Sequence, residues 1–278
     1  MKRVGELGML GVLLCAGGCT SFQSDPPASP PPSTDGGVDA AVPPVQGSAP
    51  ELPDPPVAVT ASAVPVSALV TTVAGSGNAA FADGSGASAS FNEPEVLAVD
   101  DKGMIFVGDT FNNRIRRIAP DRAVTTFAGS GENPSGLGAF ADGPASVAGF
   151  FRPRGIAVAA GVVYIGDNGN HAVRKATTSG AVTTLVGSPS SAGYADGPVS
   201  MAKFFYPSGL ALKPDGTVCV ADRNNDRVRQ ITPAGIVSTI AGNGTRGYAD
   251  GPGASASFSR SSAIVGPRDP RGRSRAAA

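Results

Sequence analysis

The chain has 278 residues, of which 41% are hydrophobic and 16% charged, so it can build one or two domains with a sizeable core. Its 38 glycines and 25 prolines argue against a mainly helical protein. The 22 basic residues balance 22 acidic ones, which argues against a nucleic-acid partner, and the single histidine, His171, excludes metal sites built from several histidines.

Residues 1–18 are typical of an export signal. Lys2 and Arg3 precede an apolar run that is too short to span a bilayer, and small residues then lead to Cys19. This end of the signal resembles the lipobox of bacterial lipoproteins, in which the cysteine is lipidated. The resemblance implies a membrane anchor on Cys19 and a place in the cell envelope, and Thr20 favours the outer membrane by analogy. The alternative is an ordinary cleaved signal in which Cys19 is incidental.

Residues 19–67 are predicted to be a disordered tether. They are crowded with Pro, Ser, Ala, Asp and Gly, and they lack the spaced apolar residues that a core requires. Proline-rich chain is stiff and extends at roughly 3 Å per residue. The segment therefore reads as a spacer between the membrane and a folded domain.

Residues 68–265 contain a repeat of three elements. A Val-Thr-Thr-Val-Ala-Gly type of run starts at positions 70, 124, 182 and 237, so successive starts are 54, 58 and 55 residues apart. The second element is an aromatic residue followed by Ala-Asp-Gly, and it occurs four times. The third is Asp-x-x-Asn with an arginine seven residues after the aspartate, and it occurs three times. Residues that are identical in all repeats of one chain are those that each structural unit requires.

Each unit contains four short runs with β-strand character. In the second unit these runs are Gly155–Ala159, Val162–Gly166, Ala172–Ala176 and Val182–Val186, separated by Gly, Asp, Asn and Pro. Four strands in a repeat of about 55 residues indicate the blades of a β-propeller. The sequence therefore predicts an all-β fold.

The same runs carry a family resemblance. Pro-x-Gly-Ile-Ala-Val at residues 153–158, Val-Tyr-Ile-Gly-Asp at 163–167 and Val-Arg-Lys at 173–175 resemble the NHL repeat, and residues 207–212 and 218–222 repeat the pattern. The Gly-rich stretch with Phe/Tyr-Ala-Asp-Gly is similar to that of exported bacterial members. The resemblance implies a propeller, usually with more blades than this chain shows.

The count of elements predicts three complete four-stranded blades, an orphan N-terminal strand and an incomplete C-terminal unit. The chain enters the repeats at a fourth-strand motif, residues 70–75, and after Phe258 only residues 263–265 read as the start of a strand. Three explanations stay open: a truncated or frame-shifted chain, two chains that complete one ring as a homodimer, or a partner that covers the open blade face. Residues 266–278 form a basic Arg/Pro tail.

The binding face is expected where the longest loops gather. In a blade, the loops after the second and fourth strands leave from the same side, so the Asp-x-x-Asn loops and the aromatic-Ala-Asp-Gly insertions share one rim. The candidate ligand-binding residues on this rim are Asp83, Asp142, Asp196, Tyr194, Asp109, Asn112, Asp167, Asn170, Asp222 and Asn225.

Each of these residues also has a structural interpretation. The Asp-x-x-Asn pairs suit Asx turns that close the hairpin, with the arginine pairing across it. Asp-Gly-Pro suits a helix N-cap, with the Phe eight residues after the Asp packing on the blade. His171 is expected as an exposed turn residue and Cys219 as a buried thiol. Calcium is the only cofactor that the same oxygens suggest, and no other metal site is expected.

Three functions fit these observations unequally. The first is an exported, membrane-anchored binding or scaffold module that offers its loop-rich face to a protein or a glycan. The second is an enzyme, because relatives of the NHL family include metal-dependent lyases and other propellers are lactonases; one histidine and no unrepeated acidic cluster weigh against it. The third, RNA binding, is known for some intracellular NHL proteins, and export and zero net charge oppose it.

Overall fold

The computed structural model describes residues 69–131 and 138–265. Every strand in this part of the chain belongs to one compact unit. The predicted signal, tether, lipidated Cys19 and basic tail lie outside the described residues. Among the residues that are described, no helix is long and apolar enough to cross a membrane.

Three antiparallel sheets make up this unit. The first has the order β1-β5-β4-β3-β2, the second β6-β7-β8-β9 and the third β10-β14-β13-β12-β11. The strands are β1 (Gly84–Ser85), β2 (Pro94–Val99), β3 (Ile105–Asp109), β4 (Arg114–Ile118), β5 (Ala123–Ala128), β6 (Pro153–Ala159), β7 (Val162–Asp167), β8 (Ala172–Ala176), β9 (Val182–Val186), β10 (Gly197–Pro198), β11 (Pro207–Leu212), β12 (Val218–Asp222), β13 (Arg227–Ile231) and β14 (Ile236–Ala241).

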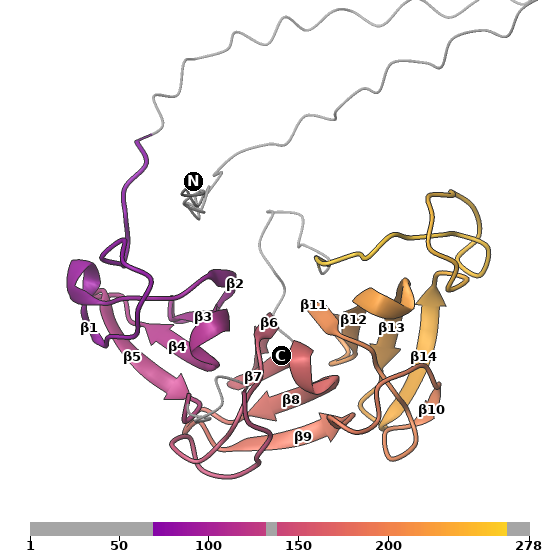
Figure 1. Cartoon of the computed structure of the whole chain (residues 1–278), viewed down its shortest axis with the longest axis horizontal. Helices are drawn as coiled ribbons and strands as arrows, with labels where there is room; N and C mark the ends of the chain where they lie inside the picture. Colours follow the sequence, from indigo (N-terminus) through magenta and orange to yellow (C-terminus); the bar gives the residue numbers. More distant parts are fainter. Residues whose placement is uncertain (1–68, 132–137, 266–278) are drawn as a thin grey trace, which may run out of the picture. The chain divides into compact units, whose positions relative to one another are not determined.

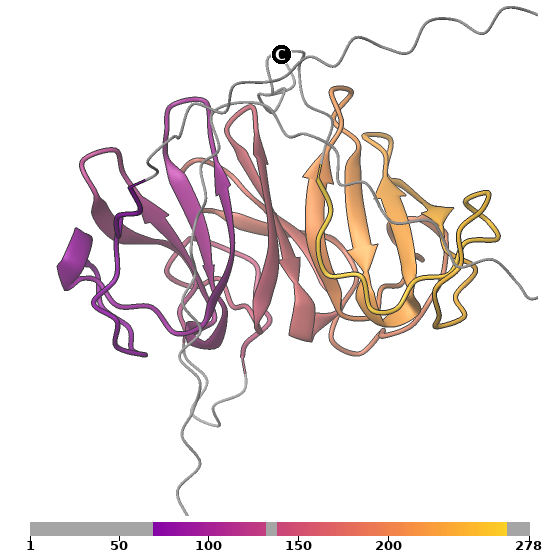
Figure 2. The same ribbon diagram turned by 90° about the horizontal axis from the view of Figure 1, so that it is seen from above.

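Each sheet is a four-stranded meander, as the sequence predicts for a propeller blade. The two-residue strands β1 and β10 add to the outer strands β5 and β14, and a single bridge between Gly143 and Val182 takes that place in the middle sheet. Figure 1 shows β2, β6 and β11 innermost and β5, β9 and β14 outermost. Turned by 90°, Figure 2 shows the three sheets standing next to one another. We number the blades 1 to 3 in chain order.

The hydrophobic core lies between neighbouring blades. Phe106 and Phe127 of blade 1 meet edge to face, with ring centroids 4.9 Å apart, and they pack against Ile165 of blade 2. Val173 of blade 2 and Val220 of blade 3 belong to the corresponding second cluster. Because neighbouring blades cover both faces of blade 2, its strands are apolar runs without clean alternation. Burial of each such side chain contributes about 1.5–3 kcal/mol to the free energy of unfolding.

Small residues let the inner strands approach closely. A Cβ atom added at Gly166 would lie 2.6 Å from the carbonyl oxygen of Ser208 in the next blade, which leaves no room for a side chain. Cys219 is buried and free on β12, as expected for a core thiol. The contacts between successive inner strands thus depend on backbone proximity as well as on apolar side chains.

Both ends of the described repeats carry parts of a further blade. Residues 70–75 are assigned no strand, because the described residues contain no sheet beside them to pair with. The loop that follows them nevertheless has the same geometry as in the other repeats. Gly75 N–H donates to Gly86 O at 2.9 Å, as Gly129 N–H does to Ala145 O. At the other end, Gly209 N–H donates to Ser262 O at 3.0 Å, so residues 261–265 lie along β11 as an inner strand of a next blade would.

Candidate functional site

A buried arginine joins two aspartates at the rim of each blade. In blade 2, Arg174 is fully buried, and its guanidinium contacts Asp167 Oδ2 at 2.8 Å and Asp142 Oδ1 at 2.6 Å. Asn170 Nδ2 donates to the same Asp167 oxygen at 2.9 Å, and the N–H of Phe151 donates to Asp167 Oδ1 at 2.8 Å. The pairing of the arginine with the Asp-x-x-Asn aspartate, seven residues apart, is therefore as the sequence predicted.

Blades 1 and 3 repeat this cluster. Arg116 lies 2.7 Å from Asp109 and 2.6 Å from Asp83, and Asn112 donates to Asp109 at 2.9 Å. The corresponding contacts of blade 3 are those of Arg229 with Asp222 at 2.7 Å and with Asp196 at 2.6 Å, and that of Asn225 with Asp222 at 2.8 Å. We call these three groups the rim clusters.

Aromatic side chains cover each buried guanidinium. Tyr194 lies over Arg229, with the guanidinium carbon 4.8 Å from the ring centroid, and Phe204 lies at the same distance. The Tyr194 hydroxyl is 3.2 Å from Asp196 and 3.1 Å from Thr239. Phe81 and Phe140 take the place of Tyr194 in the other blades. The phenylalanine eight residues after the rim aspartate packs on the blade as expected, since Phe204 is fully buried.

The two aspartates of a cluster differ in their protonation chemistry. Burial raises the pKa of Asp167 and of Asp222 to about 6, against the effect of the arginine and the donors around them. For Asp142, burial alone would raise the pKa, but hydrogen bonds from Thr184 and the nearby Arg174 together lower it. The pKa of Asp196 is lowered in the same way by Arg229 and Thr239.

The two kinds of loop share one rim, as predicted. Asn112, Asn170 and Asn225 each donate a hydrogen bond from the Asp-x-x-Asn turn to a backbone oxygen of the aromatic-Ala-Asp-Gly insertion, at 2.7–2.9 Å. All ten candidate ligand-binding residues lie within the rim clusters, so the structure brings them together blade by blade. Ligand binding by these residues stays a prediction, and the contacts present are those of a structural clamp.

Two expectations about these loops are wrong. The Asp-x-x-Asn aspartates do not close Asx turns, because Asp109 Oδ1 accepts from the distant N–H of Asn92 at 2.7 Å. A 3-10 turn, η2 (Thr110–Asn112), follows, with η3 (Asn168–Asn170) and η4 (Arg223–Asn225) at the same place in blades 2 and 3. The Asp-Gly-Pro aspartates are not helix N-caps, because Asp142 binds Arg174 and the N–H of Thr184. In blade 1, where Ser85 replaces the proline, Asp83 binds Arg116 and the 3-10 turn η1 (Gly86–Ser88) follows.

His171 is buried rather than exposed. It ends η3 in a left-handed conformation with φ of 55°, as a turn residue, but it is only 9% exposed. Its Nδ1 accepts from the N–H of Tyr206 at 3.2 Å, and burial lowers the pKa of His171. In the same way, Asn113 Oδ1 accepts a hydrogen bond from the backbone N–H of Arg152, and Asp226 Oδ1 accepts one from that of Arg260. The side chain at this position of the turn therefore links one blade to the next. The sequence of a single turn does not reveal this link.

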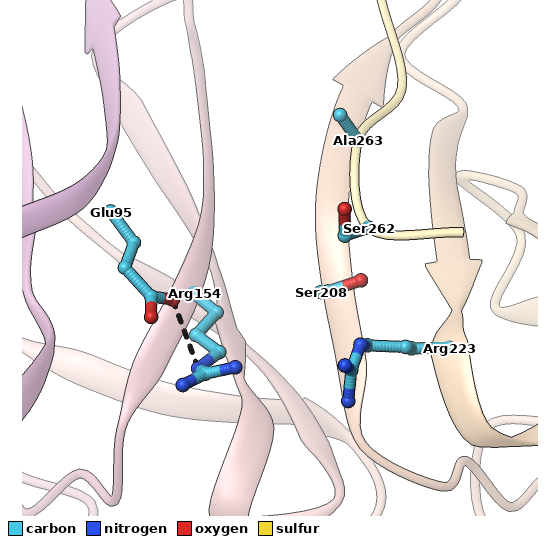
Figure 3. Close-up of a pocket in the computed structure, with 6 residues that line it drawn as sticks. All are labelled: Glu95, Arg154, Ser208, Arg223, Ser262 and Ala263. Atoms are coloured by element: carbon cyan, nitrogen blue, oxygen red, sulfur yellow. Dashed lines mark ion pairs between the residues drawn. The ribbon is translucent and has the colours of Figure 1, made fainter. Parts of the chain in front are cut away.

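A pocket that was not predicted from the sequence lies where the inner strands begin. This axial pocket has a volume of about 390 Å³ and is lined by Glu95, Arg154, Ser208, Arg223, Ser262 and Ala263 (Figure 3). Glu95, Arg154, Ser208 and Ser262 are equivalent positions of four successive inner strands, one residue after Pro94, Pro153, Pro207 and Ser261. The signal was present in the repeat: this position is acidic, basic or neutral, although the residue before it is proline in three of the four repeats.

The pocket holds two guanidinium groups and one carboxylate. Arg154 Nε lies 3.0 Å from Glu95 Oε2, and Figure 3 shows Arg223 on the opposite side, next to Ser208. Among the described residues, Arg223 forms no ion pair. Burial raises the pKa of Glu95, and Arg154 opposes that shift. A formal charge of +1 suits an anionic group.

Metal ligation has little support in this part of the protein. No group of three His, Cys, Asp or Glu side chains in residues 69–131 and 138–265 is arranged to hold a metal ion. The aspartate oxygens that suggested calcium are bound to arginine, asparagine and backbone donors. Calcium binding stays a prediction without an observation behind it.

Side-by-side four-stranded meanders with inner strands gathered around an axis define a propeller-type protein. Residues 150–176 and 204–231 match the family model of the NHL repeat. The NHL repeat-containing protein 2 of Gallus gallus is 37% identical over 84 residues, which are 30% of this chain and 11% of that protein. These two segments, one in blade 2 and one in blade 3, are therefore similar to the NHL repeat.

Two further similarities are to a plant protein and to a solved bacterial structure. The protein SUPPRESSOR OF QUENCHING 1, chloroplastic, of Arabidopsis thaliana is 39% identical over 72 residues, which are 26% of this chain and 7% of that protein. A crystal structure of an auxiliary nutrient binding protein from Bacteroides thetaiotaomicron shares 21% identity at a TM-score of 0.46, over 59% of this chain and 40% of that one. The matches span only a small fraction of the curated relatives.

Proposed function

We propose that this chain is an exported NHL-repeat binding module that takes an anionic ligand group in the axial pocket. The ligand is a protein or a glycan that displays a carboxylate, sulfate or phosphate, and it approaches from the loop-rich face. One observation carries this proposal: the pocket holds two guanidinium groups and only one carboxylate, at positions that the repeat does not keep.

The pocket chemistry gives the preference for anions. Arg223 has no ion-pair partner among the described residues, so its guanidinium is available for a two-point contact with an oxyanion. Ser262 adds a hydroxyl group on the same side of the pocket, whereas the buried Ser208 hydroxyl donates to the backbone oxygens of Ala221 and Ser261. Hydrogen bonds to charged groups contribute about 1.5–3 kcal/mol each, so one bidentate contact accounts for a specific but moderate affinity.

Binding is tested with paired ligands that differ only in charge. Carboxylated or sulfated oligosaccharides and glutamate-rich peptides should bind, and the neutral oligosaccharides and glutamine peptides of equal length should not. Arg223→Ala should weaken binding roughly tenfold or more. Arg117→Ala is the matched control, because Arg117 lies on β4, does not line the pocket, and donates a hydrogen bond to Thr125 Oγ1 at 3.5 Å. Equal binding of neutral and anionic probes would contradict the proposal.

We further propose that the lipid on Cys19 anchors this module in the cell envelope, with the outer membrane as its site. The lipobox-like end of the signal and the Pro-rich tether support this arrangement. Mass spectrometry of the mature N-terminus tests it: a diacylglyceryl cysteine at position 19 is the expected result, and loss of membrane fractionation in Cys19→Ser should accompany it. An unmodified N-terminus at any other residue would overturn the anchor.

A homodimer remains our proposal for how the repeats close. The blade-1 face carries half-buried Leu97 and Ile105, whose blade-2 counterparts, Ile156 and Val163, are buried. A second chain that covers this face would bury them. Light scattering of the purified protein tests this directly, since a monodisperse monomer at all concentrations would rule the dimer out.

A further inference from the structure

Two backbone hydrogen bonds tie the end of the outer strand to the insertion that follows it. After blade 1, the N–H of Gly129 donates to Ala145 O at 2.9 Å, and the N–H of Ser130 donates to Ala148 O at 2.8 Å. The same two bonds recur after residues 70–75 and after blade 3, at 2.7–2.9 Å, with Gly75, Ser76, Gly242 and Asn243 as donors. The pair of bonds is therefore a regular part of the repeat.

Both bonds are missing after blade 2. By their places in the repeat, they would run from Gly187 N–H to Val199 O and from Ser188 N–H to Ala202 O. Neither N–H donates a hydrogen bond to any residue that the structure describes, and neither oxygen accepts one. Two backbone donors and two backbone acceptors that other repeats pair internally are thus open to water or to a ligand.

Pro189 explains why the loop departs from the repeat. The other repeats have glycine at this position, Gly77, Gly131 and Gly244, with φ between 71° and 84°. The proline ring holds φ at about −65°, so the chain after Ser188 cannot follow the same path. It forms a separate turn instead, in which Ser191 N–H donates to Ser188 O at 3.1 Å.

A pocket of about 420 Å³ lies where the two hydrogen bonds are missing. Its lining includes Gly187, Ser188, Val199 and Ala202, the four residues with unpaired backbone groups. Val186 and Ala202 are buried, and with Val199 they belong to the hydrophobic cluster of blades 2 and 3. The pocket thus combines hydrogen-bond donors and acceptors with an apolar floor. We call it the loop pocket.

We propose that the loop pocket binds the acetamido group of an N-acetylated amino sugar. An amide group accepts and donates at once, so its oxygen takes the N–H of Gly187 or Ser188 and its own N–H goes to the oxygen of Val199 or Ala202. Its methyl group lies on the apolar floor. The exposed Ser200 offers a hydroxyl to the sugar ring.

An added peptide strand fits this place less well than a compact amide. On β9, the N–H of Val182 already donates to Gly143 O at 2.8 Å, and the N–H of Thr184 donates to Asp142 Oδ2 at 3.0 Å. The unpaired donors of Gly187 and Ser188 are on adjacent residues, whereas an added strand pairs through alternate residues over several positions. The chemistry therefore favours a sugar substituent over a peptide.

Amide NMR of the full chain with uncharged sugars tests the site. N-acetylglucosamine should shift the amide signals of Gly187 and Ser188 and slow their hydrogen exchange by about tenfold, because binding pairs these groups. Glucose, which has no acetamido group, should leave both signals in place. In the free protein, both amides should exchange faster than their paired counterparts Gly129 and Gly242.

Two variants act on the pocket in different ways. Pro189→Gly should allow the loop to take the repeated path, form the two missing bonds and weaken sugar binding about tenfold or more. Ser200→Trp should have the same effect by filling the pocket from an exposed position. Pro120→Gly is the matched control, because Pro120 is an exposed proline in the turn between β4 and β5 and does not line the pocket.

The outcomes separate this site from its alternatives. Signals of Gly187 and Ser188 that do not move at the highest soluble concentration of N-acetylglucosamine would overturn the proposal, as would binding that survives both variants. Equal shifts with glucose would overturn recognition of the acetamido group, and equal shifts with N-acetylglycine N-methylamide would assign the pocket to a peptide instead. This site is independent of the axial pocket, so loss of anion binding with retained N-acetylglucosamine binding would refute the axial site alone.

Discussion

The rim clusters and the axial pocket contain the same residue types and use them in different ways. In the rim cluster of blade 2, Arg174 is fully buried and is held by Asp167, Asp142 and two backbone oxygens. In the axial pocket, Arg154 has one carboxylate partner and Arg223 has none among the described residues. A repeated arginine thus reports a requirement of the blade, whereas an arginine that breaks the repeat is available to a ligand.

The largest effect is expected from the buried arginine. Arg174→Ala leaves Asp167 buried without its charge partner, and such a change costs about 3–5 kcal/mol of the free energy of unfolding. Denaturant unfolding of the full chain measures it. Arg223→Ala should change the same free energy by less than about 0.5 kcal/mol, as for a surface side chain. Equal losses for the two variants would remove the distinction between rim and pocket.

A smaller effect is expected at the link between blades. His171→Ala removes the acceptor for the N–H of Tyr206 and places alanine at φ of 55°, which together should cost about 2 kcal/mol. His171→Asn should cost less than about 1 kcal/mol, because Asn113 performs this role between blades 1 and 2 and asparagine tolerates the conformation. Thermal unfolding compares the two variants, and a more damaging asparagine would contradict the assigned role.

Much of the blade could be predicted from the sequence because the repeat is short-range. The strands Ala172–Ala176 and Val182–Val186 have the predicted bounds, and the pairing of Asp167 with Arg174 follows from their spacing. The second partner, Asp142, could not be found in this way, because it lies 32 residues from Arg174 on another loop. Burial of His171 and the axial pocket depend on neighbouring blades, and no spacing within one repeat encodes them.

Within a rim cluster, the half-exposed aspartate should contribute less to the free energy of unfolding than the buried one. Asp142 is about half exposed, so solvent screens its contact with Arg174, and Asp142→Asn should cost about 1 kcal/mol or less. Asp167→Asn, in the same cluster, should cost about 3 kcal/mol because both charges of that pair are buried. Unfolding free energies of the two variants test the order. A larger loss for Asp142→Asn than for Asp167→Asn would make Asp142 the principal partner of Arg174.

In the axial pocket, the carboxylate competes with a ligand for the arginine. Glu95→Gln removes the charge that pairs with Arg154 and should raise affinity for an anionic ligand by several-fold. Isothermal titration at low and high salt measures this, since the gain should shrink as salt screens the charges. Ser262→Ala is the comparison in the same pocket and should lower affinity instead. A Glu95→Gln variant that binds anions more weakly would make the carboxylate part of the recognition site.

The smallest expected effects are those of pH on the two aspartates of one cluster. Carbon NMR of the carboxyl groups should show Asp167 titrating near pH 6, because burial raises its pKa, and Asp142 titrating below its ordinary value of 3.8. The folded protein then binds the Asp167 proton more tightly than the unfolded chain does, so the stability from this group is full below pH 3.8 and is lost as pH rises through 6. The stability from Asp142 has the opposite sign, because it is present above pH 3.8 and is lost as pH falls below that value. Two aspartates that titrate together would mean that Arg174 holds them equivalently, and the difference between the buried and rim carboxylates would disappear.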